Sequence, residues 1–214
     1  MIIKLENATK RIKGNTVIDH ISMTMQSGVI YGLEGCNGSG KTMLMRLITG
    51  LIYPDTGNVR INNSILGKDI DFPKNVGMLL ENPCFLDEFT GIQNLNLLAQ
   101  LNGRISQSQI EKTLQRVGLN PRDKRTYQKY SLGMKQRLGL AAAIMELPDL
   151  ILLDEPTNAL DADGLIMLKK LILDEHQRGA MLIIASHDCA FLESIAHVIF
   201  QLQSGRLTNT RRMR

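Results

Sequence analysis

The clearest chemical pattern in the sequence is a glycine-rich run that ends in Lys41 and Thr42. Residues 35–42 fit the spacing G-x-x-x-x-G-K-[ST], in which glycines let successive backbone N–H groups point at one cluster of phosphate oxygens. Lys41 would reach the β- and γ-phosphates, and the Thr42 hydroxyl could ligate Mg²⁺. The spacing therefore predicts a nucleoside-triphosphate site. We call this segment the phosphate loop and expect its residues to bind nucleotide: Gly35, Cys36, Asn37, Gly38, Ser39, Gly40, Lys41 and Thr42.

A pair of carboxylates follows an apolar run further along the chain. Asp154 and Glu155 come directly after the apolar residues 150–153. Because ligands of parallel α/β sheets bind beyond the carboxyl ends of the strands, we expect both carboxylates beside the phosphate loop. Asp154 is then placed to hold the Mg²⁺ shell, and Glu155 to polarise a water towards the γ-phosphorus. Taken alone, such a pair is more often a solvated loop, but the upstream phosphate loop reverses that choice.

Apolar runs and helical periodicity predict the elements that must carry these side chains. Residues 29–33 form a short apolar run ahead of the phosphate loop, and residues 44–51 behind it have the apolar spacing of an amphipathic helix. Two more apolar runs, 150–153 and 181–185, flank a helical stretch. This β–α–β order with fully apolar strands predicts a parallel sheet covered on both faces, an α/β fold. Residues 1–34 are interpreted as short strands with turns.

The middle of the chain is predicted to be mainly helical. Residues 90–93 and 106–109 both match the capping-box spacing that starts a helix. Residues 85–145 are therefore expected to form a helical lobe inserted into an α/β core made of residues 1–84 and 146–214.

Composition favours one globular domain. The chain has 214 residues, of which 43% are hydrophobic and 21% charged, which excludes disorder for most of its length. No stretch approaches the roughly 18 uncharged apolar residues of a membrane helix, and the charged first residues argue against a signal peptide. Three cysteines without a CxxC pair favour a reducing cytosol over a disulfide framework or a zinc knuckle.

The charge distribution adds little that is specific. The net charge is +4, and the chain has five Phe, four Tyr and no Trp, which argues against a base-stacking nucleic-acid surface. Basic residues are scattered except for Arg211, Arg212 and Arg214 at the C-terminus. We expect a solvated, frayed end there; contact with phosphates or lipid headgroups is the alternative.

Three further segments point to one family. They are YSLGMKQR at 130–137, DEPTNALD at 154–161 and ASHD at 185–188. With the phosphate loop, this order resembles the nucleotide-binding subunits of ATP-binding-cassette (ABC) transporters over essentially the whole chain. The resemblance implies one ABC ATPase domain, residues 1–214, with the P-loop NTPase (RecA-like) fold: a mainly parallel sheet core, an N-terminal antiparallel β subdomain and an inserted helical subdomain.

Residues 130–134 resemble the family's signature motif, usually written LSGGQ. A serine hydroxyl and free backbone donors at a helix N-terminus make a second anion site, although a plain helix cap explains Ser131 equally well. The resemblance implies that Ser131 and Gly133 close over an ATP held by the phosphate loop of another subunit. Two chains would then enclose two ATP molecules head to tail, as a homodimer or as a heterodimer with another ABC ATPase subunit.

The resemblance also assigns two residues that follow the carboxylates. Residues 158–161 resemble the D-loop, in which Asp161 would help couple the two sites of the dimer. His187 resembles the switch histidine, which would donate to the γ-phosphate and orient the water; without this context it would be an ordinary loop histidine. The implied catalytic set is Glu155, His187 and Lys41.

Two positions depart from the family pattern. Ile12 stands where an aromatic residue usually stacks on adenine, so we expect weaker or less base-selective binding. Glu81 stands where most members carry glutamine; its carboxylate could ligate Mg²⁺ and adds negative charge near the γ-phosphate. Cys36 replaces a frequent proline, and only its backbone is expected to contact phosphate. With the NPCFL run at 82–86 that follows Glu81 and the YSLGM segment at 130–134, the chain resembles the branch of ABC-2-type and bacitracin- or lantibiotic-resistance exporters.

The resemblance implies an ATP-hydrolysing subunit, with ATP and Mg²⁺, that energises a separate membrane permease from the cytoplasmic face of the cell membrane. The apolar residues 82–89 are the expected docking surface. One alternative is a soluble ABC ATPase acting on nucleic acid or ribosomes, disfavoured because neither sustained heptads nor a second phosphate loop is present. The other is a weakly hydrolysing regulatory subunit, which Ile12 and Glu81 suggest and the retained Lys41, Asp154 and Glu155 oppose.

Overall fold

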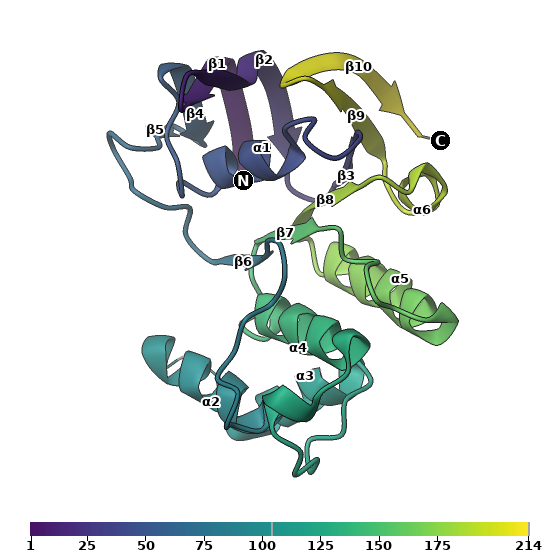
Figure 1. Cartoon of the computed structure of the whole chain (residues 1–214). Helices are drawn as coiled ribbons and strands as arrows, with labels where there is room; N and C mark the ends of the chain where they lie inside the picture. Colours follow the sequence, from purple (N-terminus) through teal and green to yellow (C-terminus); the bar gives the residue numbers. More distant parts are fainter. Residues whose placement is uncertain (104, 214) are drawn as a thin grey trace.

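The structure is a computed structural model that describes residues 1–103 and 105–213. Two β-sheets lie next to each other, and a cluster of helices extends from one of them (Figure 1). The antiparallel N-terminal sheet has the strand order β2-β1-β4-β5, with β1 Ile2–Ile12, β2 Asn15–Gln26, β4 Thr56–Ile61 and β5 Ser64–Ile65. The larger sheet has the order β10-β9-β3-β8-β7-β6, with β3 Ile30–Glu34, β6 Val76–Leu79, β7 Leu150–Asp154, β8 Met181–Ser186, β9 Val198–Gln203 and β10 Arg206–Arg212.

The larger sheet is parallel except at its β10 edge, which confirms the predicted α/β class. The register aligns Glu34 at the end of β3 with Ser186 at the end of β8, and Asp154 at the end of β7 with Ala185. The loops that follow these three strands therefore leave the sheet along one edge.

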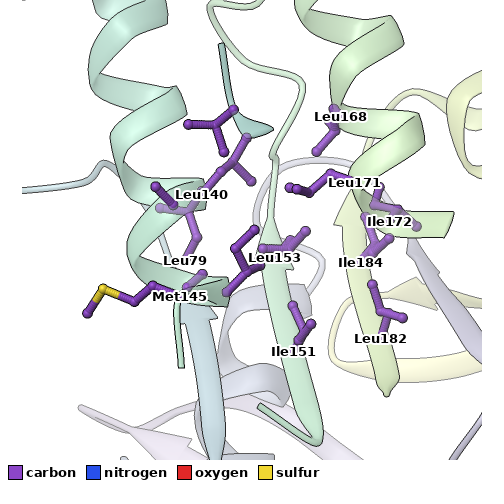
Figure 2. Close-up of a cluster of buried hydrophobic side chains, with 14 of the residues drawn as sticks. Leu79, Leu140, Met145, Ile151, Leu153, Leu168, Leu171, Ile172, Leu182 and Ile184 are labelled. Atoms are coloured by element: carbon purple, nitrogen blue, oxygen red, sulfur yellow. The ribbon is translucent and has the colours of Figure 1, made fainter. Parts of the chain in front are cut away.

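Helices and the first sheet cover the parallel sheet on both faces. Ile151 and Leu153 of β7 belong to a hydrophobic cluster with α4 (Leu132–Ile144) and α5 (Ala162–Gln177), and Figure 2 shows Leu153 between Leu140 of α4 and Leu171 of α5. The alternate residues of β7, Leu150 and Leu152, belong to a second cluster with α1 (Lys41–Ile48) and the N-terminal sheet. Both faces of β7 are thus buried, as its uninterrupted apolar run predicts. The helices are α1 Lys41–Ile48, α2 Gly91–Asn102, α3 Gln107–Arg116, the 3₁₀ turn η1 Tyr127–Lys129, α4 Leu132–Ile144, α5 Ala162–Gln177 and α6 Cys189–Glu193.

The predicted helical insert contains α2, α3, η1 and α4 between β6 and β7. Thr90 forms the complete capping box with Gln93, as predicted. Ser106 also caps its helix, but the Gln109 side chain donates to the carbonyl of Met145 at 3.2 Å, which ties α3 to α4. The helices share one hydrophobic cluster with the parallel sheet, and the lobe boundaries at 85 and 145 stay a prediction.

Two local expectations were wrong. The N-terminal strands are longer than expected, at 11 and 12 residues. Bulges interrupt the alternation of side chains that marks a continuous strand, so each long strand has the sequence pattern of shorter ones. Asn7 and His20 have φ values of 49° and 52° in these strands. The helix after the phosphate loop ends at Ile48, and Leu51 beyond it is 48% exposed. Gly50, at φ 77°, takes the left-handed conformation that commonly follows a helix end.

The expectation of a frayed C-terminus was also wrong. Residues 206–212 form β10, which pairs with β9 and runs beside β2 (Figure 1). Arg211 is held by Glu34 and Glu193, while Arg214 lies outside the described residues. Within the described ranges, no helix combines the length and the apolar character needed to cross a membrane.

Candidate nucleotide-binding and hydrolysis site

The phosphate loop joins β3 to α1, and its own backbone carbonyls bind the ammonium group of Lys41. The Lys41 ammonium donates to the carbonyls of Gly35 at 2.6 Å and Cys36 at 3.3 Å. Gly40 has a φ of 107°, and a Cβ there would lie 2.9 Å from the carbonyl oxygen of Val17. A side chain at position 40 would therefore be strained and crowded, which explains why glycine is required immediately before the lysine.

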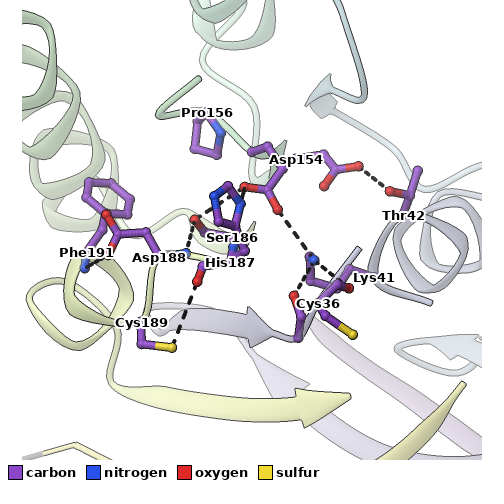
Figure 3. A network of polar contacts seen from close by, with 12 residues as sticks. Cys36, Lys41, Thr42, Asp154, Pro156, Ser186, His187, Asp188, Cys189 and Phe191 are labelled. Carbon is purple, nitrogen blue, oxygen red and sulfur yellow. Dashed lines mark hydrogen bonds and ion pairs between the residues drawn. The ribbon is translucent and has the colours of Figure 1, made fainter. Parts of the chain in front are cut away.

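Thr42, the last residue of the phosphate loop, lies beside Asp154 at the end of β7 (Figure 3). The Thr42 hydroxyl donates to Asp154 Oδ2 at 2.5 Å, and Asp154 is 5% exposed. Burial raises the pKa of the Asp154 carboxyl, and the charge of Glu155 raises it further, against the hydrogen bond from Thr42. A hydroxyl and a carboxylate are the hard oxygen donors that Mg²⁺ prefers, so this pair fits the expected metal.

The buried Asp154 gives a prediction about stability. Its raised pKa means that the native state binds this proton more tightly than the unfolded chain, so ionisation destabilises the fold once the pH exceeds the ordinary value of 3.8. Asp154→Asn is expected to raise the melting temperature of the nucleotide-free protein by about 2–4 °C at neutral pH, a gain that shrinks as the pH falls towards the ordinary value. Thermal unfolding across pH measures this. The exposed Asp149→Asn is the matched control, and an unchanged melting temperature in Asp154→Asn would contradict the prediction.

The three residues predicted to be catalytic lie together around one carboxylate. Glu155 Oε2 is 2.8 Å from Nδ1 of His187, and Glu155 Oε1 is 3.4 Å from the Lys41 ammonium. The backbone of Glu155 has a φ of 47°, and its N–H donates to the carbonyl of Ala185 at 2.8 Å. This turn after β7 places the carboxylate between the loops that follow β3 and β8, where it can take a proton from a water near the phosphates.

Gln136 belongs to this site, although our sequence reasoning did not assign it a role. It is 6% exposed on α4, and its amide donates to the carbonyls of Pro156 at 3.3 Å and Glu155 at 3.5 Å. Gln136 therefore holds the turn that carries Glu155 and Pro156 against α4. The sequence signal for Gln136 was a polar residue among the otherwise apolar buried residues of α4. A buried amide needs hydrogen-bond partners, so such a residue indicates a polar contact.

A cleft of about 700 Å³ contains most of the predicted residues. Thr16, Val17, Ser204 and Gly205 also line it, and none of these was predicted. Ile12 ends β1, is paired with Asn15, and is not among the described residues that line the cleft. Its proposed adenine contact stays a prediction. The lining residues predicted from sequence are Asn37, Gly38, Ser39, Gly40, Lys41, Thr42, Glu81, Asp154 and Glu155.

Glu81 lines the same cleft, but its carboxylate has a protein partner. Glu81 Oε1 is 2.6 Å from Nη2 of Arg46 on α1. The arginine offsets the charge that the glutamate brings close to Asp154. A role for Glu81 as a metal ligand stays a prediction.

Ser131, Gly133 and Asp161 line a second hollow of about 820 Å³. The Ser131 hydroxyl accepts from the N–H of Met134 at 3.2 Å, and Asp161 accepts from Gly164 at 2.8 Å and from Arg137 at 3.2 Å. The backbone N–H of Gly164 lowers the pKa of the Asp161 carboxyl. No described residue lines both hollows. Within one chain, the residues expected to bind the phosphates are therefore separate from those expected to cover them.

Comparisons with known proteins identify the family of this chain. The family profile described as ABC transporter matches residues 18–158. An uncharacterized ABC transporter ATP-binding protein of Bacillus subtilis is 43% identical over 99% of this chain and 97% of its own length. The bacitracin transport ATP-binding protein BcrA of Enterococcus faecalis is 40% identical over 96% of this chain and 68% of its own. The lantibiotic transport ATP-binding protein SrtF of Streptococcus pyogenes is 32% identical over 96% and 89%.

Solved structures share the fold at lower sequence identity. A dimeric bacterial ABC transporter cassette superposes with a TM-score of 0.89 at 22% identity and covers 99% of both chains. A post-hydrolysis state of such a cassette bound to ADP and Pi gives a TM-score of 0.85, also at 22% identity.

Proposed function

This chain belongs to the ABC transporter family of ATP-binding proteins, and from that premise we propose how its residues hydrolyse ATP and pass the energy to a membrane permease. The observation that supports the proposal most directly is the Glu155 carboxylate, which lies between the Lys41 ammonium and the His187 ring at the edge of the phosphate loop. A base, a phosphate-binding cation and a polar ring at one place form a hydrolytic site rather than a site for binding alone.

Each side chain has a role in this reaction. The backbone N–H groups of the phosphate loop bind the α- and β-phosphates, and Lys41 leaves its carbonyl partners for the β- and γ-phosphates. Thr42 and Asp154 would hold Mg²⁺, which neutralises phosphate charge when bound. Glu155 accepts the proton of a water whose oxygen bonds to the γ-phosphorus, while the bond to ADP breaks and its electron pair leaves with ADP. His187 orients that water and donates to the γ-phosphate.

The direct test is phosphate release by the purified protein with MgATP. Steady turnover supports the proposal, and Lys41→Ala provides the inactive reference. Nucleotide binding without turnover, in the chain alone and with its permease, would instead favour a regulatory subunit.

We further propose that the working unit is a head-to-tail dimer. The second hollow, with Ser131, Gly133 and Asp161, would cover the triphosphate that the other subunit holds at Lys41. The other subunit is either a second copy of this chain or another ABC ATPase. ATP binding closes the dimer and hydrolysis reopens it, which moves the helical lobes that carry the signature residues.

The permease is expected to dock on residues 82–89. Leu86 and Phe89 are 47% and 36% exposed there, whereas Phe85 packs edge-on against Tyr127. Because charging Phe85 would also disturb the hydrophobic cluster, the informative variant is Leu86→Glu with Phe89→Glu. It should abolish co-purification with the permease from detergent-solubilised membranes and leave phosphate release by the free subunit unchanged. Phe72→Glu, at an exposed phenylalanine outside the helical lobe, is the control; retained co-purification in the double variant would contradict this docking surface.

The relatives that transport bacitracin or lantibiotics favour an exporter of peptide-like compounds. The expected use of ATP and the three exposed, unpaired cysteines favour a position at the cytoplasmic side of the membrane. We propose no nucleic-acid surface, and no observation favours the alternative of a soluble ABC ATPase that acts on nucleic acid or ribosomes.

A further inference from the structure

Glu34, the residue directly before the phosphate loop, accepts hydrogen bonds from three side chains. Its Oε1 accepts from Cys189 Sγ at 3.1 Å and from Gln201 Nε2 at 3.2 Å, and its Oε2 is bonded to Nη2 of Arg211. Burial alone would raise the pKa of the Glu34 carboxyl, but these three hydrogen bonds together lower it. The carboxylate is therefore held in its charged form by α6, β9 and β10.

Arg211 is fixed in turn by a second carboxylate. Its Nη1 lies 2.9 Å from Oε1 of Glu193 at the end of α6. Arg211 and Glu34 are 177 positions apart in sequence, so this contact depends on the C-terminal strand.

The same C-terminal hairpin supports the middle of the phosphate loop. Gly205, in the turn between β9 and β10, donates its N–H to the carbonyl of Ser39 at 2.9 Å and accepts from the N–H of Asp19 at 2.8 Å. Gly205 has a φ of 76°, and a Cβ there would lie 2.7 Å from the carbonyl oxygen of Val17. The turn is thus packed between β2 and the phosphate loop with no room for a side chain.

We propose that Arg211 is a positioning residue for nucleotide binding: through Glu34 it anchors the start of the phosphate loop, while the turn at Gly205 supports its middle. The proposal deepens the proposed function and rests on it. Neither Arg211 nor Glu34 is among the described residues lining the cleft, so the effect reaches the nucleotide through the loop backbone. Because the loop backbone binds phosphates that ADP and ATP share, loss of the contact between Arg211 and Glu34 lowers the affinity for both nucleotides by a similar factor.

The test uses Arg211→Gln, with Arg212→Gln as the matched control. Arg212 is the neighbouring residue of β10, is exposed, and makes no ion pair with any described residue. Binding of MgADP and MgATP to the purified full chain is measured by fluorescent-nucleotide displacement, at a temperature where both variants are folded. We expect both dissociation constants to rise about three- to tenfold in Arg211→Gln and to stay at the wild-type value in Arg212→Gln. Arg211→Lys, which keeps the charge, should recover part of the loss.

A double variant tests whether Arg211 acts through Glu34. If it does, Glu34→Gln with Arg211→Gln should bind nucleotide no more weakly than the weaker single variant, because both changes break one contact. Additive losses would overturn this route, and unchanged ADP binding in Arg211→Gln would overturn the proposal, even if its melting temperature falls. A wild-type chain that binds ADP but releases no phosphate from MgATP, alone and with its permease, would refute the proposed function separately.

Discussion

Replacing Glu155 by glutamine is expected to lower steady-state ATP turnover by about a hundredfold or more while leaving ATP binding intact. Glutamine has the same shape and can keep a hydrogen bond to His187, which lies 2.8 Å from Glu155 Oε2. It has no carboxylate to take the proton from the attacking water. With ATP bound and not cleaved, the closed dimer should accumulate.

Two measurements check this expectation. Phosphate release reports turnover, and size-exclusion chromatography with and without MgATP reports the trapped dimer. Glu6→Gln, at an exposed carboxylate of β1 that pairs with Arg60, removes the same charge far from the cleft and should keep full turnover. Turnover near the wild-type rate in Glu155→Gln would mean that another group is the base.

The second large effect is expected at Ser131, outside the cleft that contains Lys41. Ser131→Asp keeps a good helix cap, because aspartate and serine cap equally well, but places a negative charge where the neighbouring subunit's γ-phosphate is expected. In a head-to-tail dimer this variant should lose turnover by about a hundredfold. ATP binding to the separate chain should persist, since Lys41 and Thr42 are untouched.

Ser106 provides the matched control. It caps α3 in the same way, so Ser106→Asp changes the same chemistry without facing a nucleotide. Equal turnover in Ser131→Asp and the wild type would refute the capping of one subunit's triphosphate by the other.

A mixing experiment identifies the partner. Ser131→Asp and Lys41→Ala chains should each be inactive. If the dimer contains two copies of this chain, a mixed pair has one complete site, and an equal mixture should recover about a quarter of wild-type turnover. No recovery, with both chains folded and dimer-competent, would assign the missing half to a different ABC ATPase.

The sequence by itself predicted which side chains meet around Lys41, and the structure brings Thr42, Asp154 and Glu155 together there. Glycine spacing, Lys41 and the carboxylates after an apolar run are contiguous patterns, and buried parallel strands must deliver the residues after them to the same edge of the sheet. The parallel β7 and β8 and the loop positions of Glu155 and His187 result from these local rules. The start of α4 at Ser131 was equally local, since a cap acts within one turn.

Only the tertiary structure decided which side chains from distant parts of the sequence contact and support the residues around Lys41. Three contacts join elements that no local sequence pattern relates: Gln136 with the carbonyl of Pro156, Arg46 with Glu81, and Arg211 with Glu34. The bulged strands and the ordered C-terminus were misjudged for the same reason: a bulge or an edge strand is stabilised by its partner strand, not by its own residues. Sequence periodicity reports which side of an element is buried, whereas the partners of a charged or polar side chain depend on how the whole chain packs.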